Sequence, residues 1–476
     1  MTCNYITFVV LFATISISYL QVAPMKASFI EVDRYTPYLL PPSVQDWLPE
    51  KHLARFVVEI VEQLDLRDLK ESYSGRGSQP YHPEMLTVLL FYGYATGVFS
   101  SRKLERNTFD SVAFRYITAN THPDHDTISE FRKRFLPQLK KIFVEILAVA
   151  HQMGVMKLGK VSIDGTKVKA NASKHNALSY GHACKLEEFL EAEVAELLSK
   201  AEAADQADIP DGMDIPTELA IRQERIKAIK EAKAEIERRA ALRHAKEQKE
   251  YENKVAERSR KEQETGKKLG GKKPQPPTAG PSEKDQVNLT DSESRIMPTS
   301  SGGFEQAYNA QAGVDTESML IVTTHVTQAT NDKQELGPAL TNLRQLPEEL
   351  GTVDTIIADT GYYSEANIEL CEDKKVIPYI SVERDSHHQP LMERFAEPPP
   401  LPEDAGAVDC MKHRLKTKSG KEIYATRKCT IEPVFGIIKA VIGFRQFLLR
   451  GFEAVQGEWD LVCIAFNLKR LFALAK

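Results

Sequence analysis

The sequence lacks paired cysteines. Its six cysteines are scattered, form no CxxC pair and are accompanied by no histidine at zinc-ligand spacing. The pattern indicates neither a disulfide framework nor a zinc site, and it favours a reducing cytoplasm. The chain also lacks an excess of positive charge, because its net charge at pH 7 is −5 and its pI is about 6.2. The overall charge therefore gives no argument for nucleic-acid binding, and only local clustering of basic residues can supply one.

The start of the chain has one apolar run, Ile6–Leu20, that resembles the core of a signal peptide. No Lys or Arg precedes this run, and no A-x-A cleavage site follows it. It is short for a membrane span and is interrupted by Thr and Ser. Export, a packed strand or helix, and a non-structural extension upstream of Met25 are the open interpretations. We assign residues 1–29 to an N-terminal extension.

A length of 476 residues is enough for two or three domains. Residues 30–155 have helical apolar spacing and predict an all-helical domain. Residues 83–98 are apolar on nearly all sides, which indicates a central helix. Residues 123–154 predict one long helix, capped by Asp126 or Thr127. Three basic residues load the early turns of this helix: Arg132, Lys133 and Arg134. A DNA-binding helix-turn-helix and an ordinary bundle with solvated charges explain this pattern equally well.

The middle of the chain changes from a strand to a long charged segment. Residues 158–170 have a strand pattern that contains Asp164 and Gly165. Residues 181–265 are rich in Ala, Glu, Lys and Arg and predict an inserted helical hairpin, a solvated arm that resembles a coiled coil. Residues 266–299 are rich in Pro, Gly and Lys and predict a flexible linker.

Strand and helix patterns alternate after the linker. Residues 304–315 and 319–328 predict a hairpin, and residues 353–363 and 376–384 predict two further strands, with helices between them. The order of elements predicts a mixed α/β sheet and not a doubly wound parallel one. We assign this sheet domain to residues 156–180 and 300–476.

The segment Thr430–Phe452 predicts one helix, with Thr430 as its N-cap. Glu432 and Lys439 lie on one face of this helix, two turns apart. The flanking segment 412–450 contains ten basic residues and only two acidic ones, Glu422 and Glu432. Such a concentrated basic patch favours a polyanionic partner.

Three carboxylates lie at the ends of predicted elements: Asp164 and Asp359 close strands, and Glu432 opens a helix. Carboxylates that converge in this way suit Mg²⁺, which takes oxygen ligands and is usually shared with substrate phosphates. Each residue alone also fits a turn or a helix cap. Asp332 and Asp354 are near element ends as well, so spacing alone leaves the set open.

Three segments resemble the catalytic blocks of the DDE transposases of bacterial insertion sequences. They are SIDGTKVKANAS, IIADTGYYSEANI and IEPVFGIIKAVIGFRQFLLRG. Residues 30–155, with PDHDTISEFRKRF, are similar to the N-terminal, InsH-like domain of the same group. The resemblance covers nearly the whole chain after about residue 25, and the third block is its most specific part.

The resemblance implies an RNase H-like catalytic domain whose triad is Asp164, Asp359 and Glu432. It implies Mg²⁺ as cofactor, with Mn²⁺ as a substitute, and double-stranded DNA as partner, namely the terminal repeats and the target. Synapsis implies a homodimer. Lys439 matches the lysine that contacts the transposon end. Tyr424 and Arg427 match a tyrosine and an arginine before the glutamate, although Lys428 occupies the usual arginine spacing.

The expected DNA-binding set is Lys439, Tyr424, Arg427, Lys428, Arg445, Arg132 and Lys133. Weaker candidates follow the first two blocks. Asn171 and Lys174 either touch DNA or are surface polar residues, and Tyr362 and Tyr363 either stack on a flipped base or pack. Asn309 and Gln311 alternate in a strand and are expected to face solvent.

The leading hypothesis is a metal-dependent transposase that cuts transposon ends and joins them to target DNA, in a nucleoid-associated, cytoplasmic setting. A second hypothesis is a catalytically inactive, transposase-derived repressor that only binds DNA. All three carboxylates are present, which argues against it. A third is a structural protein built around the arm, which leaves the basic third block unexplained.

Overall fold

A computed structural model describes residues 43–71, 73, 80–203, 215–266, 270–299, 302–382, 397–402 and 405–476. The predicted extension 1–29, with the apolar run Ile6–Leu20, lies outside these residues, as do residues 204–214 of the predicted arm. Within the described ranges, no helix is both long enough and apolar enough to cross a bilayer.

The first part of the described chain is helical, as the spacing of its apolar residues predicts. Its elements are η1 (Val44–Trp47), α1 (Leu53–Val61), α2 (Arg67–Glu71), α3 (Pro83–Ala95), α4 (Ser101–Asp110), α5 (Val112–Ile117), α6 (His125–Phe135), η2 (Leu136–Gln138) and α7 (Leu139–Gln152). Almost every residue of α3 is buried, and α3 packs on α1 and on the C-terminal helix α16 (Phe452–Leu474). The prediction of a central helix is confirmed.

The long helix predicted over residues 123–154 is wrong, because the chain breaks into α6, the short turn η2 and α7. Pro137 lies in η2, where its ring and missing N–H prevent a continuous α-helix. The cap of α6 is Asp124, whose carboxylate accepts a hydrogen bond of 2.7 Å from Thr127 N. Neither Asp126 nor Thr127 holds that position.

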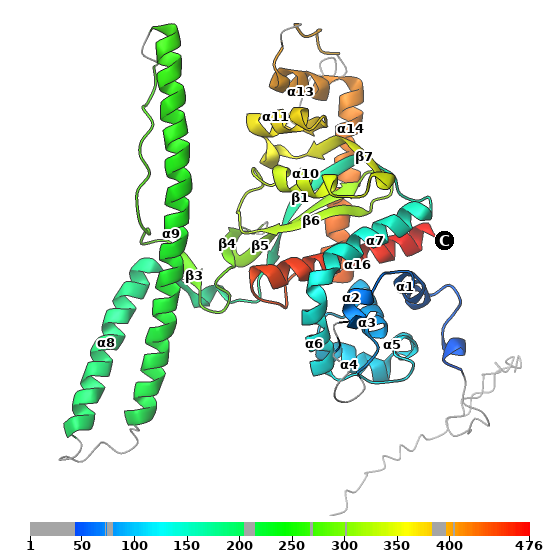
Figure 1. Cartoon of the computed structure of the whole chain (residues 1–476), viewed down its shortest axis with the longest axis horizontal. Helices are drawn as coiled ribbons and strands as arrows, with labels where there is room; N and C mark the ends of the chain where they lie inside the picture. Colours follow the sequence, from blue (N-terminus) through cyan, green and yellow to red (C-terminus); the bar gives the residue numbers. More distant parts are fainter. Residues whose placement is uncertain are drawn as a thin grey trace, which may run out of the picture. The chain divides into compact units, whose positions relative to one another are not determined.

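The second part contains a six-stranded mixed sheet, drawn in Figure 1. Its strands are β1 (Leu158–Lys169), β4 (Arg295–Pro298), β5 (Phe304–Asp315), β6 (Ile321–Thr327), β7 (Gly351–Ala358) and β8 (Ile377–Ile380). The order is β4-β5-β1-β7-β8, with β6 also paired to β5. Strand β5 is antiparallel to its partners, whereas β1, β7 and β8 are parallel. The predicted mixed sheet and its β5–β6 hairpin are confirmed.

Helices pack on the sheet and on each other between the strands. They are α10 (Leu336–Arg344), η4 (Glu348–Leu350), η5 (Thr360–Tyr362), α11 (Glu365–Asp373), α13 (Ala407–Lys416) and α14 (Lys418–Cys429). Helix α10 contacts β6, α11 contacts β8, and α14 contacts β7 and β8. The C-terminal helix α16 contacts β6, α3 and α7, so its buried side chains join the sheet to the N-terminal helices in one apolar core.

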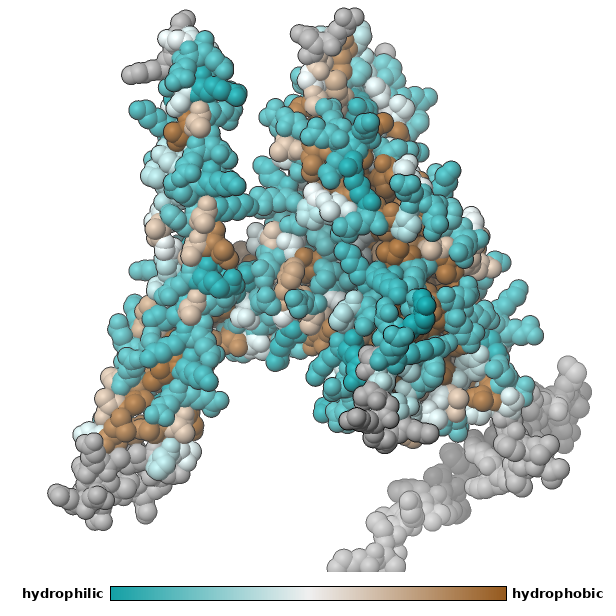
Figure 2. Space-filling view, in the orientation of Figure 1, coloured by the Kyte–Doolittle hydropathy of each residue, from teal (hydrophilic) through white to brown (hydrophobic). Residues whose placement is uncertain are grey.

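The predicted arm forms two paired helices, α8 (Tyr180–Ala203) and α9 (Ile215–Thr265), which are drawn in green in Figure 1. Leu190, Ile229 and Ile236 belong to a small separate core between them. Figure 2 shows hydrophobic residues gathered over part of α8 and α9. Among these helices' exposed apolar side chains are Phe189 and Ile221.

The flexible linker predicted over residues 266–299 is wrong for its second half. Strand β3 (Gln286–Asn288) pairs with β2 (Ala177–Ser179), which follows the short turn η3 (Lys174–Asn176). Strand β4 pairs with β5 and extends the main sheet. The sheet therefore includes residues before 300, and the Pro/Gly-rich composition concealed two short pairing segments.

The single helix predicted over Thr430–Phe452 is also wrong. The chain forms α15 (Ile431–Gly436) and a π-helical turn, η6 (Ile437–Ile442), and then leaves the helix at Gly443. Gly443 has φ 86°, a left-handed conformation that suits glycine and ends the helix. Val441, an apolar residue of this turn, is 66% exposed.

Candidate active site

The two aspartates of the expected triad lie on adjacent parallel strands. Asp164 lies within β1, directly after Ile163, which is opposite Ala358 at the end of β7. Asp359 follows Ala358 and caps the short turn η5, where its Oδ1 accepts a 2.8 Å hydrogen bond from Gly361 N. Because parallel neighbours run in the same direction, the two carboxylates are brought to the same place in the sheet.

Glu432 reaches the same place from the first turn of α15. The three carboxylates meet at the guanidinium of Arg427, which comes from α14. Arg427 Nη2 lies 2.7 Å from Asp164 Oδ2 and 3.8 Å from Asp359 Oδ2, and its Nη1 lies 2.9 Å from Glu432 Oε1. One cation therefore holds three acids that come from three different elements.

The burial of these groups differs. The side chains of Arg427 and Asp164 are 13% and 15% exposed, whereas those of Asp359 and Glu432 are 39% and 50% exposed. Burial raises the pKa of Asp164 to about 6, against the attraction of Arg427 and with a further rise from Asp359. Burial lowers the pKa of Arg427, but Asp164 and Asp359 outweigh it, so the net change is upward. The site is open on the side of Asp359 and Glu432.

Lys428, which matches the family spacing for the arginine, is exposed, while its neighbour Arg427 is directed at the carboxylates. Tyr424 lies one turn earlier on α14, is half-buried, and is close enough to Arg427 to help raise the pKa of that side chain. Arg427 lies one residue farther from Glu432 than Lys428 does. The break at Thr430, where α14 ends and α15 begins, lies between Arg427 and Glu432.

Lys439 and Arg445 lie along β1, beyond Asp164. Lys439 Nζ donates hydrogen bonds of 2.5 Å to Thr166 Oγ1 and 3.0 Å to the carbonyl oxygen of Lys167. Burial, with help from Lys167 and Arg445, lowers the pKa of Lys439. Arg445 is exposed, and its Nε donates to the carbonyl oxygen of Lys439 at 2.9 Å. Both expected DNA-binding residues therefore lie along β1, the strand that carries Asp164.

The other expected DNA contacts do not all reach the surface. Arg132 is 6% exposed and donates hydrogen bonds to Tyr94 Oη at 3.3 Å and to the carbonyl oxygen of Phe99 at 3.1 Å. Its assignment to DNA contact is wrong, because its guanidinium is enclosed between helices. Lys133 is exposed and remains a candidate DNA contact. Asn171 donates to the carbonyl oxygen of Leu448 at 2.7 Å and supports the loop after η6, while Lys174 is exposed.

Of the two alternatives left open for Tyr362, stacking on a flipped base or packing, the structure supports packing. Its ring is fully buried, and its hydroxyl donates to the side-chain oxygen of Gln311. Tyr363 is half-buried and packs against the core. Asn309 and Gln311 do not face solvent either, since both are fully buried.

A fourth carboxylate, Asp332, lies next to these buried amides. Its Oδ1 accepts hydrogen bonds of 2.6 Å from both Asn309 and Gln311, and it lies 3.7 Å from Lys167 Nζ. Asp332 also helps to raise the pKa of Asp164, whereas Asp354 is exposed on β7. The polar alternation of Asn309 and Gln311 was the only sequence signal for this cluster, and its interpretation as a solvent-facing pattern was wrong, because both amides donate to Asp332.

The residues at the triad fit a divalent metal by their chemistry. Carboxylate oxygens are the ligands that Mg²⁺ and Mn²⁺ prefer, and the three acids already surround a positive charge. The Nε of Arg427 is buried and makes no hydrogen bond. As they are arranged, no three His, Cys, Asp or Glu side chains of the described residues stand close enough to hold a metal ion. The guanidinium of Arg427 occupies the place between the three acids.

Comparison with known families assigns both parts of the chain. The model of a transposase DDE domain matches residues 278–468, and the model of a transposase domain known as DUF772 matches residues 42–134. No match was found among curated proteins or among solved structures. The DDE match includes Asp359 and Glu432. Asp164 lies outside it and is linked to it by the pairing of β1 with β5 and β7.

The mixed six-stranded sheet and the family match identify an RNase H-like DDE transposase domain. More particularly, the chain belongs to the transposases that join this domain to an N-terminal, InsH-like DUF772 domain. The family recognised from the three sequence blocks is confirmed, and with it a role in DNA transposition.

Proposed function

We propose that this protein catalyses metal-dependent DNA cleavage at transposon ends and transfers the strands to target DNA. The observation that supports this most is the convergence of Asp164, Asp359 and Glu432 on one cation at the ends of core elements. A divalent metal, Mg²⁺ or Mn²⁺, supplies the Lewis acid that activates the attacking water or 3′-hydroxyl and stabilises the leaving oxygen.

The side chains of this chain would divide the work as follows. Asp164, Asp359 and Glu432 hold the metal, while Arg427 releases them and turns its guanidinium to a DNA phosphate. Lys439, fixed on β1 by Thr166, and Arg445 hold the backbone of the transposon end. Tyr424, Lys428 and Lys133 are further backbone contacts, all exposed or half-buried. Such positioning and charge stabilisation account for most of phosphoryl-transfer catalysis.

The reaction needs two transposon ends and a target, so we infer a homodimer in the synaptic complex, acting on nucleoid DNA in the cytoplasm. A direct test is strand transfer of a precut end by Asp359→Asn. Joining should disappear while binding to the same duplex persists. Asp354→Asn provides a matched control, because Asp354 is an exposed aspartate on β7, the strand that directly precedes Asp359. Full joining by Asp359→Asn would remove Asp359 from the triad. Binding without joining in the wild-type protein would favour the repressor.

A further inference from the structure

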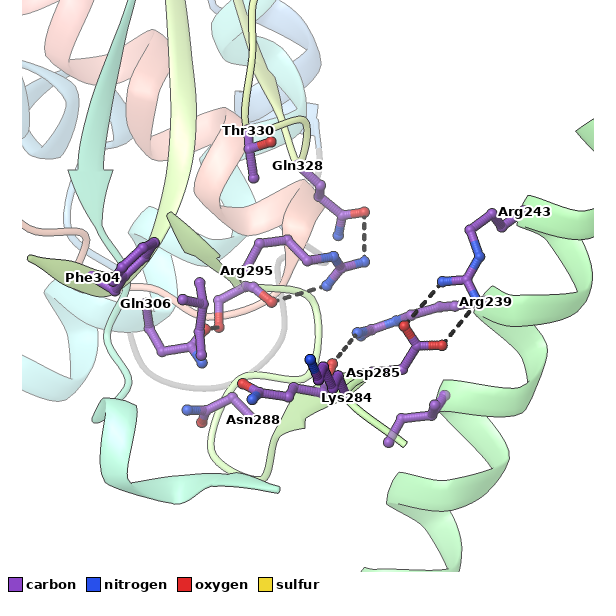
Figure 3. A pocket seen from close by; sticks show the side chains of 14 residues that line it. Arg239, Arg243, Lys284, Asp285, Asn288, Arg295, Phe304, Gln306, Gln328 and Thr330 are labelled. Atoms are coloured by element: carbon purple, nitrogen blue, oxygen red, sulfur yellow. Dashed lines mark hydrogen bonds and ion pairs between the residues drawn. The ribbon is translucent and has the colours of Figure 1, made fainter. Parts of the chain in front are cut away.

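A second concave surface lies where α9 meets β3, β4 and β5, away from the carboxylates. It is a hollow of about 700 Å³, shown in Figure 3. In that view Arg239 and Arg243 extend from α9 toward the segment that carries Asp285, and Arg295 and Gln328 lie opposite. The hollow therefore brings the inserted arm and the main sheet into one site.

Most of the charged side chains that line the hollow are basic. Four basic side chains line it, Arg239, Arg243, Lys284 and Arg295, against one acidic one, Asp285. The charge of Asp285 is paired with that of Arg243, whose guanidinium donates two hydrogen bonds of 2.9 and 3.0 Å to the carboxylate. Lys284 is exposed, and its side chain makes no ion pair to any carboxylate in the part of the chain that the structure describes.

Arg295 forms no hydrogen bond or ion pair with a carboxylate among the described residues, although Glu235 and Glu293 lie near enough to favour its charged form. Its guanidinium donates only to neutral oxygens: the carbonyls of Ser292, Glu293 and Ser294, and the side-chain oxygen of Gln328. Burial, and then the nearby charge of Arg239, lower the pKa of Arg295 to about 10. Arg239 is itself paired with Glu235 at 2.7 Å. A positive charge held by neutral groups in a recess attracts an anion.

A smaller hollow continues the site past Phe304. It is lined by Lys174, His175, Ala177, Gln286, Ile296 and Phe304, and the last three also line the larger hollow. Phe304 is 64% exposed, although it is the first residue of a core strand. An exposed aromatic ring between two basic recesses offers an apolar contact beside the phosphate-binding charges.

The hollow lies on the same face of the sheet as Asp164. Asp164 is paired with Ala312 of β5, and Phe304 lies eight positions before Ala312 on the same strand. Because side chains alternate between faces, an even separation places both on one face. At ~3.4 Å per residue the separation is about 27 Å, which corresponds to about eight base pairs of a duplex.

Basic side chains occupy the path between the two places. Beyond Lys439, the loop after η6 runs beside the end of β1, where Phe447 N donates to the carbonyl oxygen of Lys169 at 2.8 Å. Arg445 and Arg450 are exposed on this loop, and Arg450 Nε donates to the carbonyl oxygen of Asn171 at 3.0 Å. Lys174 follows three residues later, at the edge of the smaller hollow.

We propose that the hollow at the base of the inserted arm binds the phosphate backbone of duplex DNA, about eight base pairs from the scissile end. The inference rests on the proposed function for the identity of that end, and it gives the inserted arm a role in holding substrate. Lys174 and Lys284 contact phosphates, and Phe304 packs against the sugar edge. Arg295 and Arg239 provide the positive electrostatic potential that attracts the phosphates.

The test measures binding of the full-length protein to a random-sequence duplex of about three helical turns, in EDTA, over a range of KCl. EDTA keeps the result independent of catalysis. The double variant Lys174→Glu/Lys284→Glu should lower the slope of log affinity against log salt by about 1.8, or ~0.9 for each lost phosphate contact. Phe304→Ala should weaken binding at every salt concentration and leave the slope unchanged.

The matched control is Lys249→Glu/Lys254→Glu, which makes the same charge change at exposed positions of α9 outside the hollow. If both double variants behave alike, the hollow does not bind DNA and the proposal is overturned, even where the wild-type protein joins strands. If only Lys174→Glu/Lys284→Glu lowers the slope of log affinity against log salt, the proposal holds, even where strand transfer fails.

Discussion

Charged residues are used in two opposite ways in this protein. At the junction of the N-terminal helices with α16, Arg132, Glu458 and Asp460 are all buried, and Tyr94 links the first two through hydrogen bonds of 3.3 and 3.0 Å. Along β1, Lys439 and Arg445 lie at or near the surface and reach only neutral oxygens. The first set lies inside the packed core, whereas the second carries charge at or near the surface.

The comparison teaches that a run of basic residues does not reveal which of them face outward. In α6, Arg132 and Lys133 are adjacent, yet one is enclosed and the other is exposed. A helix turns its successive residues by about 100°, so only the packing of α6 decides which cation meets solvent. The first prediction uses this pair directly.

Arg132→Ala should produce the largest loss of stability, of about 3–5 kcal/mol, because it leaves the buried Glu458 carboxylate without its compensating charge. The measurement is the free energy of unfolding from chemical denaturation. Lys133→Ala is the matched control and should change that free energy by less than about 0.5 kcal/mol. Equal effects of the two substitutions would contradict the distinction between buried charges that stabilise the fold and exposed charges that do not.

Asp460 should make the stability depend on pH. Burial raises its pKa to about 6, although Thr324 Oγ1 and Gln456 Nε2 donate hydrogen bonds to it. A raised pKa means that the folded state binds the proton more tightly, so this contribution to stability is present below about pH 4 and is lost as the pH rises through 6.

Asp460→Asn keeps an acceptor for these hydrogen bonds and removes the charge. From pH 4 to pH 8 its free energy of unfolding should therefore rise relative to that of the wild-type protein, by at most about 3 kcal/mol. Denaturation of both proteins across this range is the measurement. A difference that stays constant with pH would mean that Asp460 is not buried as a titrating group.

Lys439→Gln should have a smaller effect than the two preceding substitutions. This effect should be on DNA binding and not on stability. Losing one phosphate contact should lower the salt slope of DNA binding by about 0.9, while the free energy of unfolding changes little because Gln can still donate to Thr166. The measurement is DNA affinity over a range of salt, together with denaturation. A large loss of stability with an unchanged salt slope would mean that Lys439, like Arg132, stabilises the fold and does not contact DNA.

Much of the architecture followed from sequence patterns. The mixed sheet, the β5–β6 hairpin, the paired arm helices and the central helix α3 were predicted from periodicity and turn residues. The errors have local causes. Pro137 divided a helix that its apolar spacing made continuous, and Gly443 ended another. Strands β3 and β4 are stabilised by partners far along the chain, and a Pro-rich composition does not reveal such pairing.

The candidate site was predicted less completely. The family blocks pointed to Asp164, Asp359 and Glu432, and the structure places all three around Arg427. The position of Arg427 could not be read from its spacing to Glu432, because the break between α14 and α15 changes the phase of the helix. The cluster of Asn309, Gln311 and Asp332 was missed because polar residues at alternate positions of a strand suggest a face open to solvent, whereas β5 is covered on both faces.

Cleavage of an end-labelled duplex that carries the element's terminal repeat tests the central claim most directly. The reaction is run in Mg²⁺, in Mn²⁺ and in EDTA, with the wild-type protein beside Glu432→Gln. We predict nicking by the wild-type protein in either metal, none in EDTA, and none by Glu432→Gln under any condition, with DNA binding retained. Nicking by Glu432→Gln at the wild-type rate would contradict the assignment of Glu432 to the triad.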